Sequence, residues 1–133
     1  MNRKGFTLVE VLAVVVILGI IGMITVPFIM NIVTKARRDA FVDSARILVK
    51  SASEYRSNAV MNRTDRTLNI DFATDKCPLD VSGELPNSGS LKMDEKGNVE
   101  LMVWSDKAGI CVGKKIDSSE IKIVEADKNS CHL

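Results

Sequence analysis

A long apolar segment dominates the first quarter of the chain. Residues 11–30 form a run of 20 uncharged and almost wholly apolar positions. A helix needs about 20 such residues to cross a hydrocarbon layer about 30 Å thick. The segment therefore predicts a helix that spans a membrane or anchors the chain to one.

The helical pattern continues beyond this segment. Apolar residues recur every three or four positions and form one stripe along a helix; they are Phe41, Ala45, Leu48, Ala52, Tyr55 and Ala59. We therefore expect one helix over residues 6–60, transmembrane at 6–33 and amphipathic at 34–60. At 1.5 Å per residue it would be roughly 80 Å long.

Three residues weaken the predicted helix locally. Pro27 removes one backbone donor and clashes with the preceding turn, so we expect a bend or a loosened stretch there. Gly19 and Gly22 weaken the helix further, because glycine has a low helix propensity. An ordinary kinked membrane helix would have the same features.

A small β-sheet is predicted after the helix. Residues 61–78 are polar and lack a sustained period, so they predict a loop between helix and sheet. Residues 79–133 form the head and tail, in which alternating apolar and polar residues predict three to four antiparallel strands. The expected strand segments are 91–93, 99–104, 110–112 and a less regular one at 121–124.

Helix and sheet need each other to bury their apolar surfaces. We expect one sheet face to pack on the apolar stripe of the helix, because neither element can bury enough surface alone. The fold class is therefore α+β, with a long N-terminal helix packed on a small antiparallel sheet. Trp104 would be either a core residue at the sheet edge or an exposed contact between copies of the chain.

Charge is distributed unevenly along the chain. The chain has 133 residues and a formal net charge of +1, which suits one small domain of about 100 residues plus an anchor. Residues 34–66 carry four more cations than anions, whereas residues 67–133 carry four more anions than cations. The lower helix is therefore basic and the head is acidic.

The three cysteines, Cys77, Cys111 and Cys131, all follow the predicted helix. In an oxidising exterior they allow one disulfide and leave one thiol. We favour Cys111 with Cys131, which would close a loop of 21 residues and contribute roughly 3 kcal/mol in the chain-entropy model. Cys77 with Cys131 is the alternative pair, and three reduced thiols are expected if the head is cytosolic.

The sequence contains no recognisable catalytic or metal-binding pattern. His132 is the single histidine, so it has no partner for a triad or a metal site, and the cysteines lack Cys-x-x-Cys spacing. The acidic turn at 94–98 is too short for a calcium loop and contains a lysine. The remaining calcium candidates are four tail acids, Asp117, Glu120, Glu125 and Asp127. We predict no enzyme, no cofactor and no metal site.

The N-terminus carries a compact motif, Gly5-Phe6-Thr7-Leu8-Val9-Glu10. A carboxylate in lipid is costly unless a partner compensates it. Thr7 and Glu10 have the spacing of a capping box, which would explain the acid by local structure. Cleavage after Gly5 would instead free an ammonium group at Phe6 that could meet Glu10 of a neighbouring chain. At about 4 Å and an effective dielectric constant of about 20, that pair is worth roughly 4 kcal/mol before desolvation.

This motif and the apolar run after it resemble the class III signal of type IV pilins and pseudopilins. The resemblance implies removal of residues 1–5 by a prepilin peptidase, N-methylation of Phe6, and assembly through Thr7 and Glu10 into a helical filament. It also implies an inner-membrane assembly platform and an ATPase as partners. Such proteins commonly carry a helix-bending proline where Pro27 lies. The chain would cross the cell membrane once before assembly and then lie in a cell-surface filament.

Several other assignments compete with a type IV pilus subunit. The N-terminal segment could be a secretory signal, but the apolar core of such a signal has about 7–15 residues and is shorter than this one. A type II secretion pseudopilin and a competence pseudopilin for DNA uptake fit the same motif. For DNA, basic residues of the lower helix would touch phosphate and binding would weaken with salt, but the acidic head disfavours this partner. A membrane-anchored binding module that never polymerises is the remaining alternative.

Overall fold

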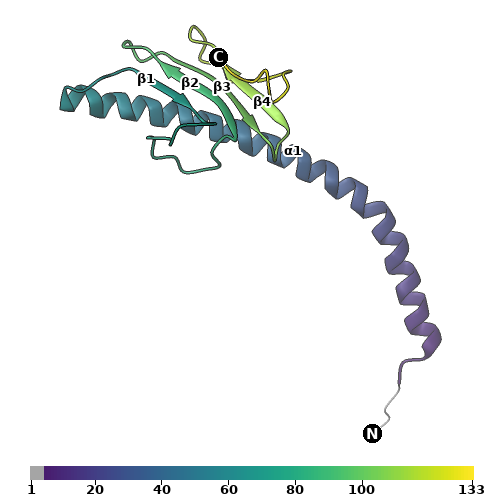
Figure 1. Cartoon of the computed structure of the whole chain (residues 1–133). Helices are drawn as coiled ribbons and strands as arrows, with labels where there is room; N and C mark the ends of the chain where they lie inside the picture. The colour runs from purple at the N-terminus through teal and green to yellow at the C-terminus, as the bar shows by residue number, and fades with distance from the viewer. Residues whose placement is uncertain (1–4) are drawn as a thin grey trace. The chain divides into compact units, whose positions relative to one another are not determined.

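The computed structural model describes residues 5–133 as one helix and a five-stranded antiparallel sheet (Figure 1). The chain divides into two compact units, an N-terminal unit that ends at Lys35 and a head unit, Ala36–Leu133. The helix and the sheet confirm the predicted α+β class.

Helix α1 (Leu8–Asn62) is continuous for 55 residues and contains Pro27. It begins and ends about two residues later than expected. At its C-terminal end, Arg63 adopts a left-handed backbone with φ of 55°, and the Thr64 N–H donates to the Ala59 carbonyl oxygen at 3.0 Å. Such a left-handed residue is a common way to end a helix, because it turns the chain away from the helix axis.

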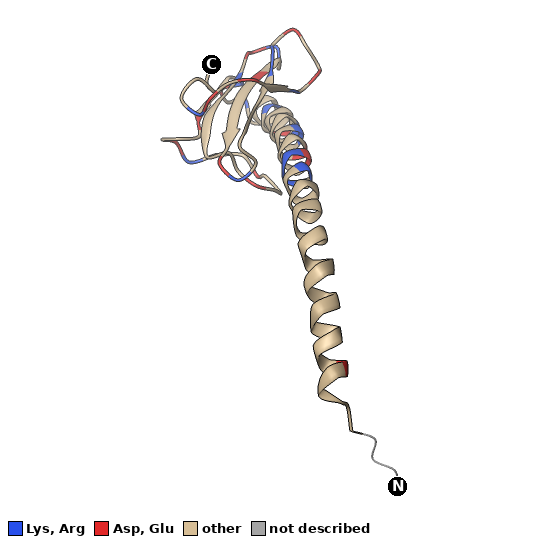
Figure 2. Cartoon of the chain, turned by 90° about the vertical axis from the view of Figure 1, so that its right-hand side faces the viewer, with Lys and Arg blue, Asp and Glu red and all other residues tan. Residues whose placement is uncertain are grey.

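The N-terminal unit exposes its apolar side chains. Every large apolar residue from Phe6, at 87% exposure, to Val33, at 41%, is exposed. An 18-residue window of α1 has a mean hydropathy of 2.8 and no buried residue, so the helix is long and apolar enough to cross a membrane. Figure 2 shows this part of α1 without charged residues except for one acid near its start, which the sequence identifies as Glu10.

The strands follow one another in the sheet in the same order as in the chain. They are β1 (Leu68–Asp71), β2 (Ser88–Met93), β3 (Val99–Ser105), β4 (Ile110–Lys114) and β5 (Lys122–Val124). The expectation of three to four strands missed β1, which lies inside the segment predicted to be the 61–78 loop. β1 has only two apolar residues, Leu68 and Ile70, and both are buried, so four residues were too few to show a period.

The core lies between the sheet and the C-terminal part of α1, along which the sheet is seen in Figure 1. Five of the six residues of the predicted helix stripe are buried: Phe41, Ala45, Leu48 and Ala52 are at most 2% exposed and Ala59 is 4% exposed. The sixth, Tyr55, is partly buried and packs against the core. The fully buried sheet residues that face the stripe in the core cluster are Ile70, Leu91, Leu101, Val103 and Val112. The predicted packing of sheet on helix is therefore confirmed.

Trp104 is not a core residue. It lies between buried Val103 and buried Ser105 on β3, is partly exposed, and is absent from the core cluster. Its indole Nε1 donates to Asp106 at 2.9 Å. The other prediction, a contact between copies of the chain, stays open.

The tail is tied to the sheet by a disulfide. Cys111 of β4 and Cys131 are bonded, with their Cα atoms 5.8 Å apart. Near the C-terminus, the Leu133 N–H donates to the Ser90 hydroxyl of β2 at 3.0 Å. Cys77 is a partly buried free thiol among residues 5–133, so the structure holds the favoured pairing and lacks the alternative one.

Candidate assembly site

Thr7 and Glu10 form a reciprocal cap at the start of α1. The Thr7 backbone N–H and hydroxyl both donate to Glu10 Oε2, at 2.8 and 3.0 Å. The Glu10 N–H donates back to the Thr7 hydroxyl at 3.3 Å. This is the geometry of a capping box, which satisfies donors that the first helical turn leaves unpaired.

The second carboxylate oxygen of Glu10 is left for another partner. Within residues 5–133, the hydrogen bonds to this carboxylate all go to Oε2. In the sequence, no other charged residue occurs between Glu10 and Lys35. The negative charge of a carboxylate in an apolar surrounding is costly unless a positive charge pairs with it. The site can therefore accept a cation from outside the chain.

Gly5 and Phe6 precede the helix in an exposed stretch without regular secondary structure. A Cβ atom built on Gly5 would meet no described atom within 4 Å, and the Phe6 side chain is 87% exposed. The bond predicted to be cleaved is therefore open to a peptidase. Residues 1–4, which make up the rest of the predicted leader, lie outside the described residues.

Three residues of α1, Gly19, Gly22 and Pro27, were predicted to bend the helix. Cβ atoms built on Gly19 and Gly22 meet nothing within 4 Å among the described residues. Pro27 cannot donate to the carbonyl one turn earlier, but α1 continues through it. A role for these residues in bending or unwinding stays a prediction.

The basic residues of the lower helix are partly neutralised. Arg46 forms an ion pair with Asp43, and Lys50 Nζ lies 4.0 Å from a carboxylate oxygen of Glu54. Both pairs are exposed and contribute little to stability, but they reduce the positive charge available to a polyanion such as DNA.

The four tail acids are not gathered into one group of ligands among the described residues. Within the part of the chain that the structure describes, no group of three or more His, Cys, Asp or Glu residues could hold a metal ion. Asp117 precedes β5, whereas Glu125 and Asp127 follow it, so the strand separates the acids that we considered as calcium ligands.

The structure also gathers charged residues that sequence reasoning did not connect. One pocket of the head unit is lined by Arg56, Thr64, Asp65, Arg66, Glu95 and Lys96. Thr67 donates to Asp65 through its N–H and its hydroxyl, both at 2.9 Å, and these bonds lower the pKa of the Asp65 carboxyl. No local motif marks this cluster, because the fold brings together the end of α1, the start of β1 and the β2–β3 turn.

Comparison with known proteins identifies the N-terminal segment. Residues 1–26 match the prokaryotic N-terminal methylation motif, which includes Gly5, Phe6 and Glu10 and confirms the resemblance seen in the sequence. No curated protein and no solved structure matches the chain.

Proposed function

We propose that this chain, whose methylation motif supports its place in the type IV pilin and pseudopilin family, is a structural filament subunit. The motif supports a pilin-like precursor that a prepilin peptidase processes. In the proposal, cleavage follows Gly5, Phe6 is N-methylated, and the mature chain polymerises through its apolar helix. An assembly platform and an ATPase in the membrane would drive this step, and the product would be a surface pilus or a shorter pseudopilus.

The observation that carries the proposal is an exposed apolar helix with one charged residue at its start. The large apolar side chains from Phe6 to Val33 are at least 41% exposed, far more apolar surface than a soluble protein leaves in water. Lipid can cover this surface before assembly, and the helices of other copies can cover it afterwards. The same helix therefore serves first as a membrane anchor and then as a filament core.

Glu10 gives that packing a register. Hydrolysis of the Gly5–Phe6 bond places a new amino group four residues before Glu10. The cap holds Glu10 Oε2, so Oε1 is available to the amino group of a neighbouring subunit. In the low dielectric of packed apolar helices, an unpaired carboxylate is strongly disfavoured, so misaligned subunits are rejected.

Two measurements test the proposal on the full chain in its host cells. Intact mass and N-terminal sequencing should show loss of residues 1–5 and one added methyl group. Glu10→Ala should abolish filaments in sheared fractions while the head keeps its disulfide and its Trp104 fluorescence. Glu54→Ala is the matched control, because it removes an exposed helix carboxylate whose only ion pair among residues 5–133 is with Lys50, and it should leave filaments intact.

Normal filaments from Glu10→Ala would contradict the proposal, as would native protein that retains residues 1–5 and stays monomeric in the membrane. The latter result would favour the membrane-anchored binding module. Filament length, measured by electron microscopy of sheared material, separates a pilus from a pseudopilus.

A further inference from the structure

The two ends of the sheet in the head unit can be defined by strand register. Leu68 of β1 pairs with Met93 of β2, so the β2–β3 turn lies at the end where β1 begins. Cys111 of β4 pairs with Val124 of β5, so the residues after β5 lie at the opposite end, beside the β3–β4 turn. Three basic side chains line one pocket near the first end, and two acidic side chains follow β5 near the second.

A basic cluster, which we define as Arg56, Arg66 and Lys96, lies at the first end. Its members line one pocket, and none takes part in the five ion pairs of residues 5–133. The Arg56 guanidinium donates two hydrogen bonds to the Glu95 carbonyl oxygen, at 3.2 and 3.3 Å. They fix its position without cancelling its charge. Two acids, Asp65 and Glu95, line the same pocket, so three cations face two anions there. Thr67 fixes the position of the Asp65 carboxylate without cancelling its charge.

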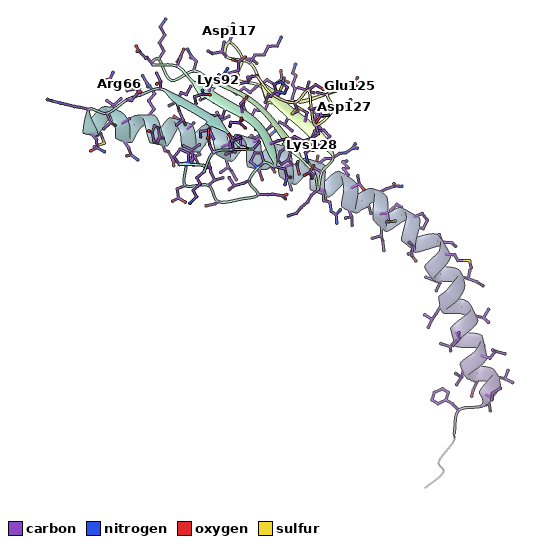
Figure 3. The ribbon with its side chains drawn as sticks, viewed as in Figure 1. Arg66, Lys92, Asp117, Glu125, Asp127 and Lys128 are labelled. Carbon is purple, nitrogen blue, oxygen red and sulfur yellow. A yellow bond between two sulfur atoms is a disulfide. The ribbon has the colours of Figure 1, made fainter. Side chains whose placement is uncertain are left out.

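An acidic pair, Glu125 and Asp127, lies at the other end. Both residues are exposed, and neither belongs to an ion pair among the described residues. The nearby Lys128 does not neutralise them, because its Nζ lies 2.9 Å from Asp106. Figure 3 shows Arg66 near one end of the sheet and the acidic pair near the other.

We propose that the acidic pair of one head contacts the basic cluster of the next head in the filament. This inference rests on the proposed function, because it requires copies of the chain in an array. Subunits related by a helical rise keep one polarity, so unlike ends of successive heads can face each other. A contact between two different patches does not close on itself and propagates as an open filament.

Charge complementarity selects the partner and its alignment. Like-charged ends repel, so the same charges disfavour head-to-head contacts. Exposed ion pairs contribute little individually and are screened beyond about 8 Å at physiological salt. The apolar helices therefore hold the filament together. The head contact changes how much filament forms and how strongly that amount depends on salt.

The test is a charge-reversal cycle in the full chain. One variant combines Glu125→Lys with Asp127→Lys, a second combines Arg66→Glu with Lys96→Glu, and a third carries all four changes. Each double reversal should lower the amount of sheared filament about fivefold or more, and the fourfold variant should return it to within about twofold of the wild type. Trp104 fluorescence and the disulfide report whether each head is folded.

The matched control reverses two other tail acids, Asp117→Lys with Glu120→Lys. These residues precede β5 and lie at the end of the sheet that carries the basic cluster, and the change in net charge is the same. Because this change adds positive charge at the end that is to meet the acidic pair, it should not lower the filament yield.

Two results overturn the inference and leave the proposed function intact: wild-type yields from both double reversals, or no recovery in the fourfold variant, while filaments still depend on Glu10. A wild-type chain that forms no filaments overturns both the inference and the proposed function.

Discussion

Arg63 occupies a backbone conformation that suits glycine. Its φ of 55° places it in the left-handed region at the end of α1, where a Cβ atom is crowded by the carbonyl group. Arg63→Gly should therefore stabilise the head by roughly 0.5–1 kcal/mol, with part of the gain offset by the greater freedom of glycine in the unfolded chain. Urea unfolding followed by the fluorescence of Trp104, the single tryptophan, measures the change.

Arg63→Ala is the control for this prediction, because it removes the charge and keeps the Cβ atom. If alanine stabilises the head as much as glycine does, then charge rather than backbone strain is the cause.

The carboxylate of Asp106 makes the head sensitive to acid. Lys128, and after it Trp104, donates to this carboxylate, and both bonds lower the pKa of Asp106. Because the folded pKa lies below the unfolded value of about 3.9, the ion pair stabilises the head above about pH 4. This contribution is lost as the pH falls through the folded pKa.

Asp106→Asn should be less stable than the wild type at pH 7, and its melting temperature should fall less steeply between about pH 4 and pH 2. The carboxyls of Asp65 and Asp94, whose pKa values are also lowered, are present in both proteins and act as an internal reference. Parallel melting curves over that range would show that Asp106 does not contribute.

Single residues were predictable from sequence where their chemistry is local. Gly5, Phe6 and Glu10 lie within six positions of one another, and the cap between Thr7 and Glu10 needs only helical spacing. Arg66 and Lys96 were not connected, because 30 positions separate them in the chain and only the register of β1 and β2 brings them to one pocket.

At the scale of elements, the contact of α1 with the sheet holds the head together. Leu48 is fully buried in the middle of the helix stripe. Leu48→Ala should destabilise the head by about 2–5 kcal/mol, because it removes buried apolar contacts and leaves a cavity. Val60→Ala is the control: Val60 is 41% exposed near the end of the same helix, and its loss should cost less than about 0.5 kcal/mol.

Urea unfolding of both variants checks this prediction. Equal and small effects would mean that the stripe does not carry the core. Equal and large losses would mean that Val60 contributes to the core as much as Leu48 does, because alanine is the better helix former at both positions.

The elements were predictable to different degrees for a physical reason. The apolar pattern of the helix extends over dozens of residues, and apolar and polar residues alternate clearly in β2 to β4. The local pattern was therefore sufficient to predict these elements. β1 has four residues, and its place in the sheet depends on pairing with β2 and on the burial of Leu68 and Ile70. Tertiary contacts decide such short strands, and these contacts are invisible in the sequence.

At the scale of the whole molecule, burial is confined to the head unit. Each buried residue of the described chain lies at position 41 or later, whereas the large apolar residues up to Val33 are exposed. The disulfide between Cys111 and Cys131 also lies within the head. The head thus contains the groups that stabilise its own fold.

A chain that begins at Ala36 should therefore fold without the N-terminal unit. We expect it to be soluble and monomeric, because the truncation removes the exposed apolar helix and no member of the core cluster. Its melting temperature should match that of the head in the detergent-solubilised full chain to within about 4 °C, the shift that roughly 1 kcal/mol gives in a domain of this size. Light scattering measures the association state, and Trp104 fluorescence follows the unfolding. A truncated chain that aggregates, or that melts without a cooperative transition, would show that residues before Ala36 stabilise the head, and the anchor and the head would then have to be treated as one folding unit.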